Sequence, residues 1–101
     1  MYKIIVSDQA WEDIKSINKY IKIALKNPKA AKDLTIKFRD AIGKLDIFPE
    51  RYQEVLINNT LIRRIPVEKY NIYYQVEKDT EIVSIARILY GGVDINQVAL
   101  S

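Results

Sequence analysis

The sequence predicts an α+β fold with the order β-α-α-β-β-β, in which an antiparallel sheet carries a helical hairpin on one face. The hairpin is indicated by apolar residues that recur at steps of three and four in the first half, with an Asn-Pro pair at 27–28 between the two runs. The sheet is indicated by three segments within residues 61–90 that are rich in apolar and β-branched residues and are separated by turn residues.

The first element is a short apolar strand at residues 2–6, and Ser7 after it is a good N-cap for a helix. That helix is predicted to run for about five turns and to present one apolar stripe. The stripe consists of Trp11, Ile14, Ile17, Ile21 and Leu25. Asn27-Pro28 ends this helix and starts the next, because proline disfavours a helical residue before it yet fits the first helical position.

The second helix has its own apolar stripe and is predicted to end near Gly43. This stripe consists of Ala31, Leu34, Phe38, Ala41, Ile42 and Leu45. Phe48 follows in the connection and is expected to fill the core beneath the chain rather than to contact a ligand. Residues 50–59 are mostly polar and are predicted to form an irregular link with a turn at Asn58-Asn59.

Three strands are predicted at about 61–67, 69–77 and 81–90, with turns at Val67-Glu68 and Lys78-Asp79. With Lys78 and Asp79 at the centre of the second turn, the expected pairs are Val76 with Glu81, Tyr74 with Val83, Ile72 with Ile85 and Tyr70 with Arg87. The face toward the helices then holds Tyr70, Ile72, Tyr74, Val83, Ile85 and Leu89. The opposite, open face holds Asn71, Tyr73, Gln75, Ser84, Ala86, Ile88 and Tyr90.

The same register assigns the basic strand to the two faces. Leu61, Arg63 and Ile65 are predicted to face the helices, and Ile62 and Arg64 the open side. Arg64 is therefore expected to join Asn71, Tyr73 and Tyr90 on a surface suited to a partner. Arg63 is interpreted as structural, with its stem on apolar surface and its guanidinium at the edge.

Arg87 and the glycine pair each have two interpretations. An arginine on an apolar strand is most simply paired with a carboxylate or with carbonyls, and contact with a target is the alternative for Arg87. Gly91-Gly92 most simply supplies the positive φ of a turn. The alternative is that this loop borders the functional surface.

Length and composition exclude several classes of protein. The 101 residues are predicted to form one domain, residues 1–101. Without cysteine or histidine the chain has no disulfides, no thiolate metal site and no ordinary proton shuttle for neutral pH, so no metal or cofactor is predicted. No segment approaches the ~20 apolar residues of a membrane span, and the cytoplasm is the expected location.

The charge of the chain is unevenly distributed. Residues 1–44 hold ten Lys/Arg against five Asp/Glu, and residues 45–101 hold six against eight. Four lysines, at positions 15, 19, 22 and 26, lie at helical spacing on the first helix. This row is either a phosphate-binding stripe or, more ordinarily, a solvated helix face, and a small basic interaction domain is one function that it would support.

The segment from Leu61 to Asp94 resembles the C-terminal half of the RelE/ParE superfamily of bacterial and archaeal toxins. In that superfamily an Arg-Arg-Ile/Phe-Pro strand, a Tyr-x-Val strand and an Arg-Ile-Leu-x-Gly ending recur in order, and here they read RRIP, YQV and RILYG. The resemblance implies a RelE/ParE-like fold. It also implies the toxin of a type II toxin–antitoxin system, a plasmid stabilisation protein that a cognate antitoxin holds inactive by wrapping it with a helix or strand.

One branch of the superfamily, typified by RelE, cleaves mRNA on the ribosome with basic residues of the sheet and a C-terminal tyrosine. By this resemblance Arg64 falls at one basic position, whereas Ile62 and Asn71 occupy two others and Val98 lies near the position of the tyrosine. Such cleavage needs groups that move protons and cations that stabilise the phosphorane. If the chain is a nuclease, the residues expected to share these tasks are Arg64, Lys69, Arg87 and Tyr90.

The other branch, typified by ParE, poisons DNA gyrase and needs only a binding surface. The ending Arg-Ile-Leu-Tyr-Gly-Gly-x-Asp resembles the Arg-Ile-Leu-His-Gly-x-x-Asp ending of this branch, with Tyr90 in place of the histidine. Because the nuclease set is incomplete, the resemblance favours a gyrase inhibitor over a ribosome-dependent endonuclease. The residues expected to bind the target are Arg64, Asn71, Tyr73, Arg87 and Tyr90.

Overall fold

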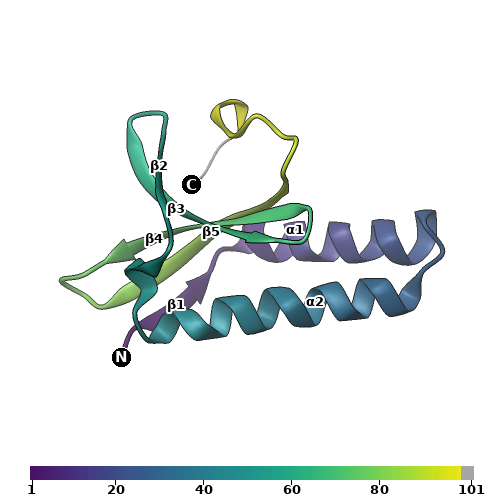
Figure 1. Ribbon diagram of the computed structural model, residues 1–101, viewed down its shortest axis with the longest axis horizontal. Helices are drawn as coiled ribbons and strands as arrows, with labels where there is room; N and C mark the ends of the chain where they lie inside the picture. The colour runs from purple at the N-terminus through teal and green to yellow at the C-terminus, as the bar shows by residue number, and fades with distance from the viewer. Residues whose placement is uncertain (99–101) are drawn as a thin grey trace.

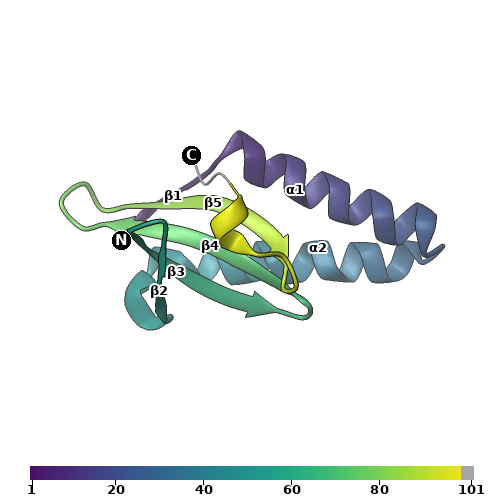
Figure 2. The same ribbon diagram turned by 90° about the horizontal axis from the view of Figure 1, so that it is seen from above.

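Two helices lie side by side on one face of a five-stranded sheet (Figure 1, Figure 2). The computed structural model describes residues 1–98. Its elements are β1 (Lys3–Val6), α1 (Asp8–Lys19), the π-helical turn η1 (Tyr20–Ala24), α2 (Pro28–Gly43), the 3-10 turns η2 (Lys44–Asp46) and η3 (Pro49–Arg51), β2 (Glu54–Ile57), β3 (Thr60–Val67), β4 (Tyr70–Glu77), β5 (Ile82–Tyr90) and the 3-10 turn η4 (Ile95–Gln97). The predicted α+β class and the helical hairpin are confirmed.

The sheet differs from the predicted one in two features. Its order is β1-β5-β4-β3-β2, and β1 runs parallel to β5, so the sheet is mixed rather than antiparallel. The segment that was expected to be an irregular link contains β2, which forms a hairpin with β3. Asn58 and Asn59 close this hairpin with φ of 49° and 64°, as a type I′ turn requires, and asparagine tolerates that conformation.

Both helices begin with a side-chain cap, at the predicted Ser7 and at Asn27 of the predicted Asn-Pro break. The Ser7 Oγ accepts a hydrogen bond from the Ala10 N–H at 3.0 Å, and the Asn27 Oδ1 accepts one from the Ala30 N–H at 3.1 Å. Pro28 occupies the start of α2. Each cap satisfies an N–H group that has no partner inside its helix.

The first apolar stripe is wrong at both ends, since Trp11 is 50% exposed and Leu25 is 56% exposed. The middle of the stripe is confirmed, since Ile21 is buried and Ile14 and Ile17 pack against the core, and Ala10 and Asp13 are buried in addition. A π-helical turn holds more residues per turn than an α-helix, so side chains beyond Ile21 leave the stripe that a 3.6-residue period predicts, as the exposed Leu25 does. The hydrogen bond from the Leu25 N–H to the Tyr20 carbonyl, at 3.2 Å, belongs to this wider turn.

The stripe of α2 is confirmed, with Ala41 only partly buried and its other members buried in the core. Phe48, however, does not fill the core and is 69% exposed. Its backbone is left-handed, at φ 58° and ψ 55°, which turns the side chain outward and brings the next residue, Pro49, inward. The proline therefore takes the buried place that was expected for the phenylalanine.

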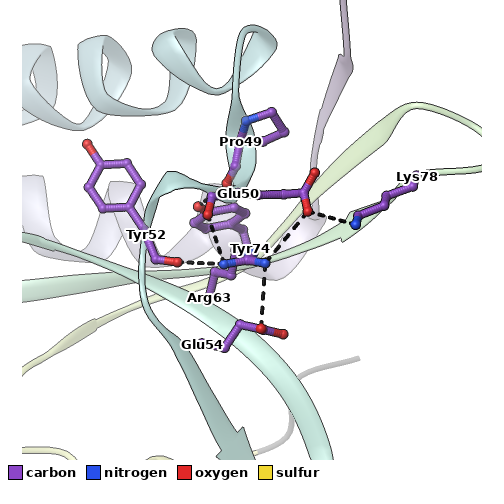
Figure 3. A network of polar contacts seen from close by, with 7 residues as sticks. All are labelled: Pro49, Glu50, Tyr52, Glu54, Arg63, Tyr74 and Lys78. Atoms are coloured by element: carbon purple, nitrogen blue, oxygen red, sulfur yellow. Dashed lines mark hydrogen bonds and ion pairs between the residues drawn. The ribbon is translucent and has the colours of Figure 1, made fainter.

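A polar network holds the connection between α2 and β2 against the sheet (Figure 3). The buried Tyr74 hydroxyl donates a hydrogen bond to the Pro49 carbonyl. The Arg63 guanidinium donates to the carbonyls of Glu50 at 3.0 Å and Tyr52 at 2.7 Å. This geometry confirms the structural interpretation of Arg63.

Stability is expected to fall between about pH 10 and about pH 12 because burial raises the pKa of Tyr74 to about 12. The folded state holds this proton more tightly than an unfolded tyrosine does, so its contribution is complete below the unfolded pKa and is lost as the pH rises through the folded one. Tyr74→Phe should make the decline shallower. At neutral pH it should cost about 1 kcal/mol, because the Pro49 carbonyl loses its donor. Urea unfolding across this pH range measures both effects, and a free energy of unfolding that falls as steeply with pH in the variant would assign the decline to other tyrosines.

The register of β4 and β5 differs from the expected one. Val76 pairs with Val83 and Tyr74 with Ile85, a shift of two residues that keeps the side chains of this part of the hairpin on their predicted faces. The hairpin loop has four residues, 78–81, rather than the tight turn on which the predicted register rests.

A bulge in β5 then reverses the predicted faces. Tyr74 pairs with Ile85 whereas Tyr73 pairs with Arg87, which leaves Ala86 as an extra residue. The Ser7 Oγ donates a hydrogen bond to the carbonyl of this extra residue at 2.8 Å. Beyond the bulge, Ile88 belongs to the core under the helices and Leu89 packs on the opposite face, the reverse of the prediction for both.

The described residues form two apolar clusters, one on each face of the sheet. The larger lies between the sheet and the helices. The smaller contains Ile57, Ile62 and Tyr73, with Leu89 and Ile95 packed against it. Within residues 1–98 no helix has the length and apolar content that crossing a membrane requires.

Candidate functional site

Arg64, Asn71 and Tyr73 lie on the sheet face opposite the helices, as predicted, and we call them the sheet-face group. Arg64 of β3 pairs directly with Tyr73 of β4, and Asn71 precedes Tyr73 by two residues on the same strand. The Asn71 amide donates a weak hydrogen bond of 3.5 Å to the Tyr73 hydroxyl. The structure therefore brings three of the predicted target-binding residues together.

Much of this face is covered by the end of the chain. Tyr73 is only 3% exposed, because Ile62, Leu89 and Ile95 pack around it. Figure 2 shows η4 lying across the sheet on this side. Arg64 and Asn71 are half-buried and form the accessible part of the sheet-face group.

Tyr90 lies on the other side of the sheet, which corrects the prediction that it would join Arg64. Because of the bulge at Ala86, Tyr90 pairs with Tyr70, whose ring packs toward the helices. The two rings meet edge to face with centroids 5.8 Å apart, and Tyr70 makes the same kind of contact with the buried Phe38. An aromatic series thus runs from the core to the surface.

Tyr90 and Lys69 border a cavity that sequence reasoning did not identify. Its volume is about 570 Å³, and we call it the tyrosine groove. It is lined by Ser16, Ile17, Tyr20, Leu25, Lys69, Tyr70 and Tyr90. Burial raises the pKa of Tyr70, and the neighbouring phenols of Tyr20 and Tyr90 raise it further.

A second cavity adjoins the tyrosine groove between α2 and the β3–β4 turn. Its volume is about 450 Å³, and it shares Leu25, Lys69 and Tyr70 with the groove. An exposed ion pair between Lys37 and Glu68 closes its rim. Their hydrogen bond, and then their mutual attraction, raises the pKa of Lys37 and lowers that of Glu68.

The glycine pair makes room rather than a left-handed turn, because neither glycine has a positive φ. A Cβ on Gly92 would lie 3.0 Å from the Tyr90 ring, and one on Gly91 would lie 3.2 Å from the Lys69 carbonyl. The Gly91 N–H donates a hydrogen bond to that carbonyl at 2.8 Å. The pair therefore leaves room for the Tyr90 ring at the mouth of the tyrosine groove.

Arg87 is bound by a carboxylate, which confirms the preferred interpretation of this residue. Its Nε lies 2.8 Å from Asp13 Oδ2 and its terminal nitrogen 3.0 Å from Asp13 Oδ1. The same Oδ2 accepts the Ile88 N–H at 3.0 Å. Asp13 is buried on the packed side of α1, at helical spacing from Ala10 and Ile17, and this spacing is the signal by which the sequence could have identified it.

The four residues expected in a nuclease do not assemble into one constellation. Arg64 lies on the open face, Lys69 and Tyr90 line the tyrosine groove, and Arg87 is engaged by Asp13. A guanidinium is protonated at any pH a protein meets, so Arg64 can stabilise charge but cannot accept a proton. Within the part of the chain described, no three carboxylates are close enough to hold a metal ion.

Comparison with known proteins gives matches over almost the whole chain. A family model described as the ParE toxin of the type II toxin–antitoxin system parDE matches residues 4–95. No curated protein has significant sequence similarity to the chain.

Three solved structures share the fold. A structure of the chromosomal ParDE toxin–antitoxin system from P. aeruginosa superposes with a TM-score of 0.74 at 15% identity, covering 89% of this chain and 96% of the other. The RelBE2 toxin–antitoxin complex from Mycobacterium tuberculosis gives 0.60 at 17% identity, with coverages of 88% and 90%. The archaeal RelE–RelB complex from Pyrococcus horikoshii gives 0.56 at 18% identity, with coverages of 92% and 98%.

Proposed function

This chain belongs to the ParE toxin family of type II toxin–antitoxin systems, and we propose on that basis that it inhibits growth by binding DNA gyrase. The accessible sheet-face residues, Arg64 and Asn71, form the centre of the proposed contact. Binding needs complementary shape and charge but no proton transfer. The chain acts as an inhibitor in this proposal and not as an enzyme.

The observation that carries the choice of gyrase over RNA cleavage is the distribution of the candidate catalytic residues. Cleavage at a single phosphate needs the base, the acid and the charge stabiliser within hydrogen-bonding distance of one substrate. Arg64 and Tyr90 lie on opposite faces of the sheet, and Arg87 is held by Asp13. This separation supports a toxin that acts by binding.

We further propose that a cognate antitoxin neutralises this toxin, in the cytoplasm where gyrase acts. The solved structures of the same fold from M. tuberculosis and P. horikoshii are complexes of a toxin with its antitoxin, which supports such a partner. Induced expression should arrest growth, and co-expression of the neighbouring gene product should restore it. Harmless expression would instead favour a non-toxic basic interaction domain.

Arg64→Ala should raise the toxin concentration that half-inhibits gyrase supercoiling by about tenfold or more, because a central arginine is a typical binding hot spot. Arg39→Ala is the matched control, since Arg39 is an exposed arginine on α2, across the sheet from the proposed contact. Equal thermal stability of the two variants shows that the fold is intact. Unimpaired supercoiling with the unmodified protein, together with cleavage of mRNA in a translating ribosome assay, would favour the RelE-like endonuclease instead.

A further inference from the structure

The tip of the helical hairpin is the most strongly charged part of the molecule. Residues 14–32 contain six lysines and no acidic residue, whereas the whole chain has a net charge of only +3, so the remainder is net acidic. Figures 1 and 2 both show this tip projecting beyond the end of the sheet. We call it the lysine lobe, and its cations are Lys15, Lys19, Lys22, Lys26, Lys29 and Lys32.

Most of these cations are exposed and are not neutralised within residues 1–98. Lys15 pairs with Glu12 and Lys29 with Asp33, and no other lysine of the lobe has a carboxylate within 4.0 Å in that part of the chain. A surface on which like charges are gathered without local compensation produces a positive potential that attracts polyanions. A solvated helix face of ordinary composition would carry charges of both signs.

Exposed aromatic rings lie beside the lysine lobe. Tyr20 is 56% exposed and Tyr90 is 53% exposed, and both border the tyrosine groove. Tyr20 comes from the π-helical turn, a feature that is frequent at functional sites. Tyr90 packs edge to face on Tyr70, and the absence of a side chain at Gly92 leaves room for its ring.

Cations adjoin these rings. Lys69 lies in the lining of the tyrosine groove, and none of the described lining residues is acidic. A further hollow of about 310 Å³ adjoins the groove, shares Ser16 and Tyr20 with it, and is lined by Lys19. The two tyrosines, Lys19 and Lys69 therefore line two adjoining hollows that reach from the end of α1 to β5.

We propose that the tyrosine groove and the lysine lobe together bind single-stranded nucleic acid. Tyr20 and Tyr90 would stack on unpaired bases, and Lys19, Lys22 and Lys69 would contact phosphates. This combination of stacking platforms with cations along a groove is how proteins bind single strands without sequence preference. In a duplex the faces of the bases are already stacked on one another, so duplex DNA would use only the cations.

An acidic polypeptide is the other polyanion that such a surface attracts. The single strand is favoured because it carries a planar face at every nucleotide, which matches two pre-positioned phenol rings, and a charge at every phosphate, which matches a row of lysines. This activity goes beyond gyrase binding and needs only the isolated toxin. Single-strand binding can therefore be disproved without affecting the proposed inhibition of gyrase, and gyrase inhibition can be disproved without affecting single-strand binding.

Fluorescence anisotropy with an oligothymidylate and an oligouridylate of about 16 nucleotides tests the proposal, because single-strand sites reach about that length. The purified protein should bind at least one of them, and the two probes distinguish DNA from RNA as the source of the strand. Tyr20→Ala and Tyr90→Ala should each weaken binding about 5- to 100-fold, whereas phenylalanine at either position should preserve it, since stacking uses the ring. Phe48→Ala, which removes an exposed aromatic ring that does not line the groove, should have no effect.

Salt dependence tests the contribution of the lysines. The double variant Lys19→Gln/Lys22→Gln should make the slope of log affinity against log salt shallower by about 1.4, the value for two lost phosphate contacts on a single strand. The control is Lys3→Gln/Lys44→Gln, which removes the same charge from the first residue of β1 and from η2 just after α2, at the end of the molecule away from the hairpin tip (Figure 1). Absence of binding at low salt, alanine variants that bind normally, equal effects of the two lysine pairs, or equally tight binding of poly-L-glutamate would each overturn the proposal.

Discussion

Asp13→Ala is expected to lower the free energy of unfolding by about 3–5 kcal/mol, the usual effect of removing one partner of a buried ion pair. The side chain of Asp13 is only 10% exposed and that of Arg87 only 15%. The substitution deprives the Arg87 guanidinium of its carboxylate and leaves the Ile88 N–H without the acceptor that it has at 3.0 Å. Since small domains are stable by only about 5–15 kcal/mol, most of the stability would be lost.

The matched control is Asp33→Ala, which removes an exposed carboxylate on α2. Its ion pair with Lys29 has a length of 3.2 Å, but the two side chains are 52% and 87% exposed, so the loss should stay below about 1 kcal/mol. Urea unfolding at neutral pH compares the two variants. Asp13→Leu combined with Arg87→Met should recover much of the stability, because apolar replacement of a whole buried pair is often tolerated. Similar losses for the Asp13 and Asp33 variants would contradict this account.

The parts of the fold that local physics determines could be predicted from the sequence. Ser7 and Asn27 cap the helices because their side chains reach N–H groups three residues on, within a single turn. The stripe of α2 has the regular 3.6-residue period, and its buried residues follow that period throughout. The type and order of the two helices and of the longer strands therefore follow from the spacing of residues close together in the chain.

The position of Tyr90 could not be predicted, because it depends on contacts distant in sequence. The extra residue Ala86 is held by the Ser7 hydroxyl, 79 positions earlier in the chain, and this bulge reverses the faces of all later residues in β5. A strand-pairing register that is inferred from the position of a turn alone assumes that every residue has a partner on the adjacent strand. The predicted surface was therefore correct for Arg64 and Asn71, which precede the bulge in chain order, and wrong for Tyr90, which follows it.

The same difference between local spacing and contacts distant in sequence explains why Tyr73 lies on the predicted face and yet is buried. Strand alternation determines the side of the sheet on which a residue lies, but it contains no information about a later segment that covers that side. Here β2 and η4 bring Ile57 and Ile95 over the ring. Neither element has a strong local pattern, because one has four residues and the other three.

Phe38→Ala is expected to cost about 3–5 kcal/mol, the range for removing a phenylalanine side chain from a core. Phe38 is 1% exposed and meets the Tyr70 ring edge to face at 5.8 Å. Phe48→Ala removes the same atoms, yet it should change stability by no more than about 0.5 kcal/mol because the side chain is 69% exposed. The two phenylalanines of this chain thus form an internal comparison in which only burial differs greatly.

The comparison of the two variants also tests why the prediction that Phe48 is buried was wrong. Hydrophobicity alone predicts that both phenylalanines are buried, whereas the left-handed backbone at Phe48 directs one of them outward and gives its place to Pro49. Equilibrium unfolding of the two variants, monitored by far-ultraviolet circular dichroism, gives the two losses directly. A loss at Phe48 close to that at Phe38 would mean that its ring is covered by the rest of the chain in solution, and the outward turn of the connection would then be incorrect.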